Sequence, residues 1–289
     1  MLRLSAAISL LSLVVQAGAY TADVEDFRRQ RAADIGGETG WAALTDLRWV
    51  ENGQFTIGRA PSNAIRLNAP SSPERLGTLI VTAQGATLQV ASGATALVNG
   101  KPVTNVQVPS NVSPASGISA GGMTMTMIER GGKRGLRVWD KVSPTRVNFR
   151  GLRWYPIDVK WRVEATFVPH QPVPKVRIQN IIGQTIEMAN PGTAVFTIGG
   201  RQIALEALLE APDADELFFM FRDATSGKAT YGAGRYLYTP LPKDARVTLD
   251  FNRAMNPPCA FTQFATCPLP PAKNRLAIAV EGGELDYKH

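Results

Sequence analysis

The residues best suited to chemistry lie between positions 222 and 256, where arginine, carboxylate, amide and phenol side chains follow one another closely. They are Arg222, Asp223, Tyr231, Arg235, Asp250, Asn252, Arg253 and Asn256. Arginines and amides of this kind bind anionic or carbonyl-bearing groups, so the set predicts a site for a small polar or anionic ligand. The predicted ligand-binding residues are Arg222, Arg235, Asn252, Arg253 and Asn256. The same residue types also anchor irregular loops by bonding buried backbone groups, and a structural role is the alternative.

A second hypothesis assigns hydrolysis of a small polar substrate to the same stretch. Asp223, Asp250 and Tyr231 are its acid–base candidates, because a pair of carboxylates can protonate a leaving group and activate water. Nucleophilic catalysis has less support, since the chain has no Gly-x-Ser-x-Gly elbow and His170 is far from these residues in sequence. Three functions therefore stay open: a binding module, a hydrolase and a structural cell-surface protein.

Both cysteines, Cys259 and Cys267, lie in a proline-rich segment directly after these residues. In an oxidising compartment we expect a disulfide between them, closing a loop of about nine residues and adding roughly 2–3 kcal/mol of stability. Free thiols and a metal site are the alternatives. A zinc site would need carboxylates such as Asp250 or Glu284, because the chain has only 2 histidines. We expect no metal, and no phosphate loop or dinucleotide fingerprint indicates a cofactor.

The first 19 residues have the layout of a secretory signal peptide. Arg3 precedes an uncharged apolar run from Leu4 to Val15, and Ala17 and Ala19 frame a cleavage site of small residues. The run is too short to span a bilayer. We therefore expect cleavage near Ala19, secretion of the remaining chain and no membrane span.

The formal net charge of +7 is a mild basic excess spread along the chain. Its two densest runs are residues 28–31 and residues 130–134. Neither run is interleaved with aromatic residues in the manner of a nucleic-acid-binding surface. We interpret both as solvated basic faces and expect no nucleic-acid partner.

Short apolar runs separated by many glycines and prolines predict a mostly β protein. The expected parts are a signal peptide (1–19), a helical arm (20–50) with a short helix at 21–35, a small β-sandwich (51–110), and a larger antiparallel β-domain (123–289) that ends in the cysteine and proline loop. The clearest strand is expected at 157–167, where apolar and polar residues alternate strictly. The loop between the two domains carries a glycosylation sequon at Asn111, which Pro114 makes a poor acceptor.

Residues 53–105 resemble the forkhead-associated scaffold through the pairs Gly58-Arg59 and Asn99-Gly100. That family binds phosphothreonine through a serine and a histidine. Glu74 and Gly77 stand at those two places here, and a carboxylate repels phosphate. The resemblance therefore implies a shared scaffold rather than phosphothreonine binding.

Most of the chain, roughly residues 35–288, resembles domain of unknown function 1684. The motifs that carry the resemblance are residues 143–146, 149–152, 155–158, 221–235, 249–253 and 256–276. Met255 departs from the pattern, which usually has an aromatic residue there. The family implies no established activity, so the resemblance marks positions of interest without supplying their chemistry.

Overall fold

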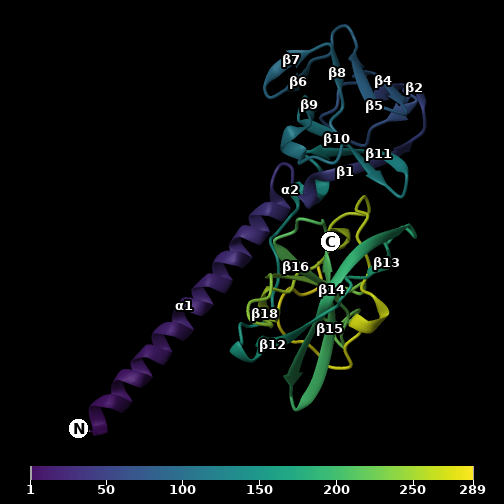
Figure 1. Cartoon of the computed structure of the whole chain (residues 1–289). Helices are drawn as coiled ribbons and strands as arrows, with labels where there is room; N and C mark the ends of the chain where they lie inside the picture. The colour runs from purple at the N-terminus through teal and green to yellow at the C-terminus, as the bar shows by residue number, and fades with distance from the viewer. Residues whose placement is uncertain (1, 289) are drawn as a thin grey trace.

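The computed structural model describes residues 2–288, with side chains described from Gly18 onward. Two β domains meet at the end of the long helix α1 (Leu2–Gly36), whose last turns lie at their junction (Figure 1). The predicted mostly β fold is confirmed. The signal peptide expected at residues 1–19 falls mainly outside the described side chains, so its cleavage stays a prediction. Among the described residues, no helix has the length and apolar character needed to cross a membrane.

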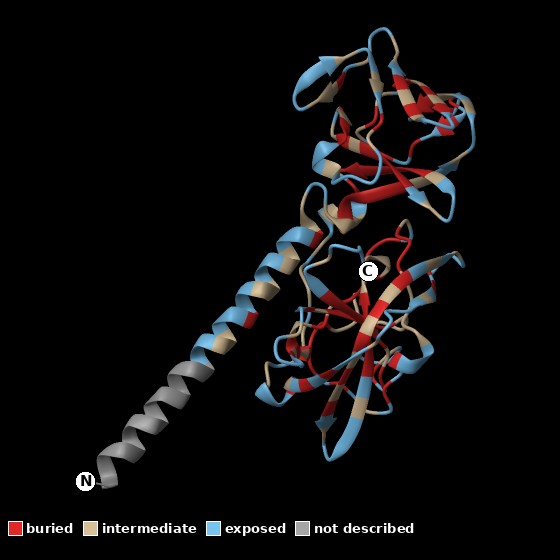
Figure 2. Ribbon diagram, in the orientation of Figure 1, coloured by how far each residue is buried: buried red, intermediate tan, exposed pale blue. Residues whose placement is uncertain are grey.

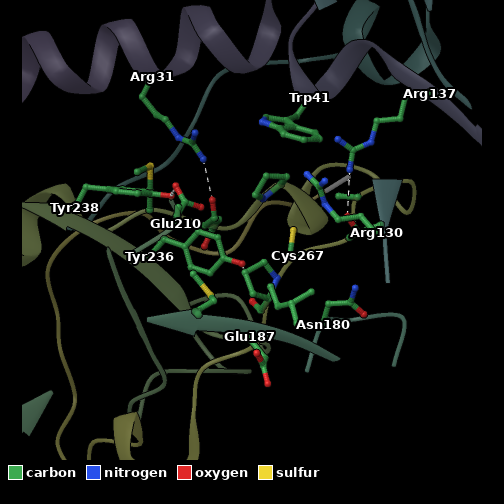
Figure 3. A pocket seen from close by; sticks show the side chains of 18 residues that line it. Arg31, Trp41, Arg130, Arg137, Asn180, Glu187, Glu210, Tyr236, Tyr238 and Cys267 are labelled. Atoms are coloured by element: carbon green, nitrogen blue, oxygen red, sulfur yellow. Dashed lines mark hydrogen bonds between the residues drawn. The ribbon is translucent and has the colours of Figure 1, made fainter. Parts of the chain in front are cut away.

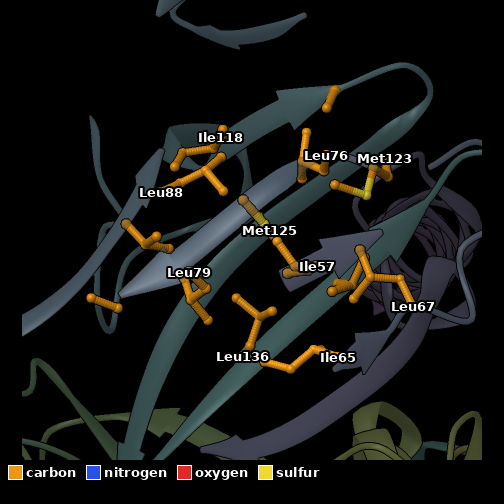
Figure 4. Close-up of a cluster of buried hydrophobic side chains, with 14 of the residues drawn as sticks. Ile57, Ile65, Leu67, Leu76, Leu79, Leu88, Ile118, Met123, Met125 and Leu136 are labelled. Carbon is orange, nitrogen blue, oxygen red and sulfur yellow. The ribbon is translucent and has the colours of Figure 1, made fainter. Parts of the chain in front are cut away.

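The N-terminal domain is a sandwich of two sheets. Its strand orders are β1-β11-β10-β9-β6-β7 and β3-β2-β4-β5-β8. The strands are β1 (Leu44–Val50), β2 (Gly53–Gly58), β3 (Ile65–Arg66), β4 (Gly77–Thr82), β5 (Gly85–Val90), β6 (Ala96–Val98), β7 (Lys101–Val103), β8 (Asn105–Gln107), β9 (Ile118–Ala120), β10 (Met123–Arg130) and β11 (Lys133–Asp140). Buried aliphatic side chains and methionines from both sheets fill the space between them (Figure 4).

The boundaries of this domain differ from those expected from the sequence. The expected helical arm (20–50) is α-helical only as far as Gly36. A 3₁₀ turn, η1 (Trp41–Ala43), then leads directly into strand β1. The hairpin β10–β11, expected in the second domain, completes the first sandwich. The reason is its alternation, which buries Met123, Met125 and Met127 in the first core. The first domain therefore extends from β1 to β11.

The C-terminal domain is one antiparallel sheet with the order β17-β16-β15-β14-β12-β18, and β13 pairs with β14. Its strands are β12 (Arg162–Pro169), β13 (Lys175–Gln179), β14 (Thr185–Ile198), β15 (Arg201–Leu209), β16 (Glu216–Phe221), β17 (Arg235–Pro240) and β18 (Arg246–Asp250). Figure 2 shows that each domain has its own buried interior. The two domains are linked by a segment that includes the short helix α2 (Pro144–Val147).

The strand expected at 157–167 is only partly formed. Its first half is a 3₁₀ turn, η3 (Val159–Trp161), and β12 begins at Arg162. The cause is local, because the Asp158 carboxylate accepts a hydrogen bond from the backbone N–H of Lys160 and caps the turn. Sequence alternation alone could not distinguish this capped turn from a strand.

The chain after β18 is irregular but ordered. It contains the 3₁₀ turns η4 (Phe251–Arg253), η5 (Pro258–Ala260) and η6 (Ala272–Asn274). The buried amide of Asn274 bonds the carbonyls of Glu206 and Met220 at 2.9 Å each, and accepts from the N–H of Glu206 at 2.8 Å. A single side chain thus fixes the loop to the edges of two strands, which is how buried backbone groups in irregular segments are satisfied.

Candidate functional site

A cleft of about 580 Å³ lies where helix α1 and the two domains meet (Figure 3). Its lining residues come from six separate parts of the chain. They include Arg31, Trp41, Arg130, Arg137, Asn180, Ile186, Glu187, Met188, Glu210, Tyr236, Tyr238, Met255, Asn256 and residues 265–268. The volume lies within the range of small-molecule sites, and a domain interface is a common place for them.

The N-terminal wall of the cleft is the outer face of the hairpin β10–β11. Alternation turns Met125 and Met127 into the first core, and it turns Arg130 and Arg137 outward. The turn between the strands is Gly131-Gly132, with φ of 56° and 72°. Glycine suits both positions because they require the left-handed region, which makes the two-residue hairpin turn that sets this register.

Arg137 is buried and forms no ion pair with any of the described residues. Its residue exposure is 9%, and its Nη2 donates to the Thr266 hydroxyl at 3.2 Å. The buried Nε has no hydrogen-bond partner among the described residues, and the guanidinium carbon lies 5.4 Å from the centre of the Trp41 ring. Burial, followed by repulsion from Arg130, lowers the pKa of Arg137 to about 10. Burying a cation without an ion-pair partner is costly, so the Arg137 guanidinium has the capacity for a further polar partner.

Arg130 reaches the same region from the end of β10. Its Nη1 donates to the Asn111 side-chain oxygen at 3.1 Å and to the Glu129 carbonyl at 2.7 Å. Both acceptors are neutral. Figure 3 shows the Arg130 and Arg137 side chains extending toward each other beside Trp41. Asn111, the predicted glycosylation residue, therefore orients one of the two arginines of the cleft.

The C-terminal wall combines tyrosines with apolar side chains. Alternation along β17 directs Tyr236 and Tyr238 to the cleft side of the sheet. The Tyr236 hydroxyl donates to the Pro268 carbonyl at 2.6 Å, and the Tyr238 hydroxyl to Glu210 at 3.2 Å. Burial raises the pKa of both phenols and of the Glu210 carboxyl. All three groups are therefore biased toward their neutral forms.

Helix α1 closes one side of the cleft through Arg31. Its Nη2 donates to the Asn256 carbonyl at 2.8 Å, and its Nε lies 3.6 Å from the Glu284 carboxylate. The Asn256 amide donates to the same carboxylate at 2.9 Å. Burial raises the pKa of Glu284 to about 7, against the opposing effects of Arg31 and Asn256. Of the ligand-binding residues predicted from sequence, Asn256 is the one that lines this cleft, and Cys267 of the predicted disulfide lines it as well.

Asp223 and Arg235 form a different kind of cluster, enclosed in the C-terminal domain. Both side chains are fully buried and form an ion pair at 3.3 Å. Arg235 also donates to the carbonyls of Val280 and Gly282, and Asp223 accepts from the Val280 N–H at 2.6 Å. The Thr225 hydroxyl also donates to the Asp223 carboxylate. These bonds tie the last segment of the chain to the sheet and leave the pair enclosed by protein.

Asp250, Asn252 and Arg253 lie against helix α1. The Tyr20 hydroxyl donates to Asp250 at 2.9 Å and accepts from the Asn252 amide at 2.8 Å, and Arg253 pairs with Asp23. Asp250 and Arg253 also line a second cleft of about 600 Å³. Carboxylates and cations alternate around this second cleft, so its charges are largely matched within the protein.

The remaining predicted residues have separate partners. Arg222 is tied through its backbone to Asn274 and Leu276. The Tyr231 hydroxyl donates to the Cys259 carbonyl at 3.1 Å, and burial raises its pKa. The proposed acid–base residues Asp223, Tyr231 and Asp250 therefore contact three different parts of the structure rather than one common site.

The expected disulfide is not formed, because Cys259 and Cys267 are both free. The backbone N–H of Cys259 instead donates to the Cys267 sulfur at 3.1 Å. A hydrogen bond with Cys267 lowers the pKa of Cys259, and burial raises that of Cys267. Backbone bonds to the β13 region hold the loop, from Ile181 N–H to the Cys267 carbonyl at 2.9 Å and from Leu269 N–H to the Gln179 carbonyl at 2.8 Å. These bonds supply the restraint expected of a disulfide.

Among the described side chains, no cluster has the composition of a metal site.

Comparison with known proteins gives a match to the family described as protein of unknown function DUF1684, over residues 147–285. The chain belongs to this family. An uncharacterised protein of Haloarcula marismortui, solved by solution NMR, is 33% identical, with 50% of this chain and 82% of that chain covered and a TM-score of 0.43. No curated protein matches the sequence.

The DUF1684 match covers only one side of the interdomain cleft. Tyr236, Tyr238 and Asn256 lie within residues 147–285, whereas Arg130 and Arg137 precede them. The match is narrower than the resemblance expected over roughly residues 35–288, and the motifs that carry that resemblance, at residues 143–276, do not include these arginines. A usable signal was present, because the two densest basic runs of the sequence contain Arg31 and Arg130. Both were interpreted as solvated faces.

Proposed function

We propose that the protein is a binding module for a small anionic ligand, which occupies the interdomain cleft and is held by Arg130 and Arg137. The observation that carries this proposal is Arg137, whose buried guanidinium has a neutral hydroxyl as its hydrogen-bond acceptor among the described residues and no carboxylate. Guanidinium groups bind carboxylate and phosphate with two parallel hydrogen bonds. An anion between the two arginines would compensate both charges.

The proposed site differs from the cluster suggested by the sequence. In the buried cluster, Arg235 already has a carboxylate and two carbonyls as partners. Such an arginine has little capacity left for a ligand. Arg137 lines a cavity, and the ligand can supply the partner that the protein does not. Binding in this place would also connect the two domains.

The test is anion binding by isothermal calorimetry, at constant ionic strength, with the wild type and Arg137→Met. The probes are inorganic phosphate, benzoate and phenyl phosphate. We expect at least one to bind the wild type, and its affinity to fall tenfold or more in R137M. Methionine retains most of the apolar stem, so the cleft wall is preserved.

The matched control is Arg134→Met on the same strand. Arg134 lies on the opposite face of β11 and already bonds the carbonyls of Thr82 and Ala83 and the Glu129 carboxylate. We expect R134M to bind the probes like the wild type. If all three probes fail to bind, or if R137M and R134M have equal effects, the cleft is not an anion site and a purely structural protein becomes the better description.

A further inference from the structure

We infer that the ligand is a phosphate monoester of a small neutral organic group, with its phosphate between Arg130 and Arg137 and its organic part in the apolar half of the cleft. This inference rests on the proposed anion-binding function and adds the ligand class. Three features of the cleft carry it: the number of unmatched charges, their position at one end, and the apolar surface beyond them.

The number of unmatched charges favours a doubly charged group. The hydrogen-bond acceptors of Arg130 and Arg137 among the described residues are neutral, and repulsion from Arg130 adds to burial in lowering the pKa of Arg137. A carboxylate brings one negative charge and compensates one of the two. A phosphate monoester carries a charge of about −1.5 to −2 at neutral pH and has three acceptor oxygens, so it can pair with both guanidinium groups at once.

The position of the charges favours a ligand that is anionic at one end only. Away from the arginine pair, the cleft is lined by the carboxyl groups of Glu187 and Glu210. A second anionic group on the ligand would approach these carboxyl groups and be repelled, or would require Glu210 to stay protonated. A neutral organic group avoids this cost.

The apolar lining gives the organic group a place to bind. Trp41 stands beside Arg137, and Ile186, Met188 and Met255 line the wall formed by the C-terminal domain. A cleft of about 580 Å³ is far larger than a single phosphate needs. Aromatic and methionine side chains make favourable contacts with rings and alkyl groups, so an organic substituent should add affinity beyond that of the phosphate.

The experiment compares three probes by calorimetry on the full chain at pH 7.5 and constant ionic strength. Phenyl phosphate has both features, inorganic phosphate lacks the ring, and benzoate has the ring with a single charge. We expect phenyl phosphate to bind at least tenfold more tightly than either of the others. Benzoate within threefold of phenyl phosphate would overturn the requirement for a doubly charged group. Inorganic phosphate within threefold would overturn the apolar subsite.

Variants separate this inference from the proposed function. Ile186→Asn replaces an apolar lining residue by a smaller polar one, and we expect it to weaken phenyl phosphate several-fold while leaving inorganic phosphate unchanged. R137M should weaken both. If anions bind and depend on Arg137 but the order of the probes differs, the ligand class is wrong and the anion site stands. If R137M has no effect on any probe, both proposals fail together.

Discussion

Arg235 and Arg137 are both buried arginines, yet their surroundings are opposite. Arg235 has no exposed side-chain surface, and it is bonded to the Asp223 carboxylate and to two carbonyls. Arg137 is bonded to one hydroxyl and packed near one aromatic ring, with its Nε unpaired among the described residues. The Nε of Arg235 is also unpaired among the described residues, so the two arginines differ in the carboxylate that Arg235 has and Arg137 lacks.

This difference shows how a polar motif and a binding site can be told apart. The stretch from Arg222 to Asn256 is dense in arginine, aspartate and asparagine, but most of these side chains bond other parts of the same chain. Partner satisfaction, rather than residue type, therefore distinguishes scaffold from site. A buried charge without a partner is rare because it costs free energy, and its presence calls for a ligand.

The largest expected effect comes from breaking the buried ion pair between Asp223 and Arg235. Asp223→Asn removes the carboxylate and leaves the Arg235 charge buried without compensation. We expect the free energy of unfolding to fall by about 3–5 kcal/mol, as for other buried ion pairs that lose one partner. Urea denaturation followed by tryptophan fluorescence measures it.

The matched control for this variant is Asp26→Asn on helix α1. Asp26 pairs with Arg29 at an exposed position, and we expect a loss below about 1 kcal/mol there. If D223N is no more destabilising than D26N, the Asp223–Arg235 pair does not hold the C-terminal segment, and its assignment to the scaffold must be withdrawn.

Part of this organisation could be predicted from the sequence. The β class followed from glycine and proline spacing. The cleft could not be predicted, because Arg31, Arg130 and Tyr236 are about a hundred residues apart in sequence and meet only when the domains dock. The disulfide was expected from the assumed compartment, whereas the backbone bonds of Cys267 that replace it depend on a neighbouring strand.

The boundary between the two β domains shows a similar limit to what the sequence can predict. The hairpin over residues 123–140 was expected within the second domain but belongs to the first. Alternation gives the spacing of buried side chains and not the core that they enter. The expected assignment to the second domain concealed the site, because it placed Arg130 and Arg137 within the same domain as their partners across the cleft.

Glu284 sharpens the comparison, because it is a fully buried carboxylate with an arginine only at 3.6 Å. Its folded-state pKa of about 7 lies above the 4.5 usual for a glutamate in the unfolded chain, so the folded protein binds more protons between these values. Stability should therefore fall as pH rises from 4.5 to 7, with about 3 kcal/mol at stake. Glu284→Gln should remove most of this fall, measured by urea denaturation at several pH values.

The control for that experiment is Glu281→Gln, an exposed carboxylate three residues earlier. We expect it to keep the pH dependence of the wild type. If E284Q also keeps it, the Glu284 carboxyl is ionised throughout this range, and Arg31 compensates it as fully as Arg235 compensates Asp223.

The smallest expected effect tests the buried charge of Arg137 directly. In buffer without the probe anions, Arg137→Met exchanges a buried, poorly compensated charge for an apolar side chain. We expect a gain of about 1 kcal/mol in the free energy of unfolding. R134M, which removes well-bonded contacts on the same strand, should give no such gain.

At a phenyl phosphate concentration one hundredfold above its dissociation constant, the wild type should gain about 2.7 kcal/mol through binding and become the more stable protein. This reversal of order is what separates a binding arginine from a structural one, since a structural arginine would make the wild type more stable in both buffers. If R137M is instead destabilised without anions, by an amount similar to D223N, Arg137 belongs to the scaffold as Arg235 does, and the contrast between the two arginines disappears.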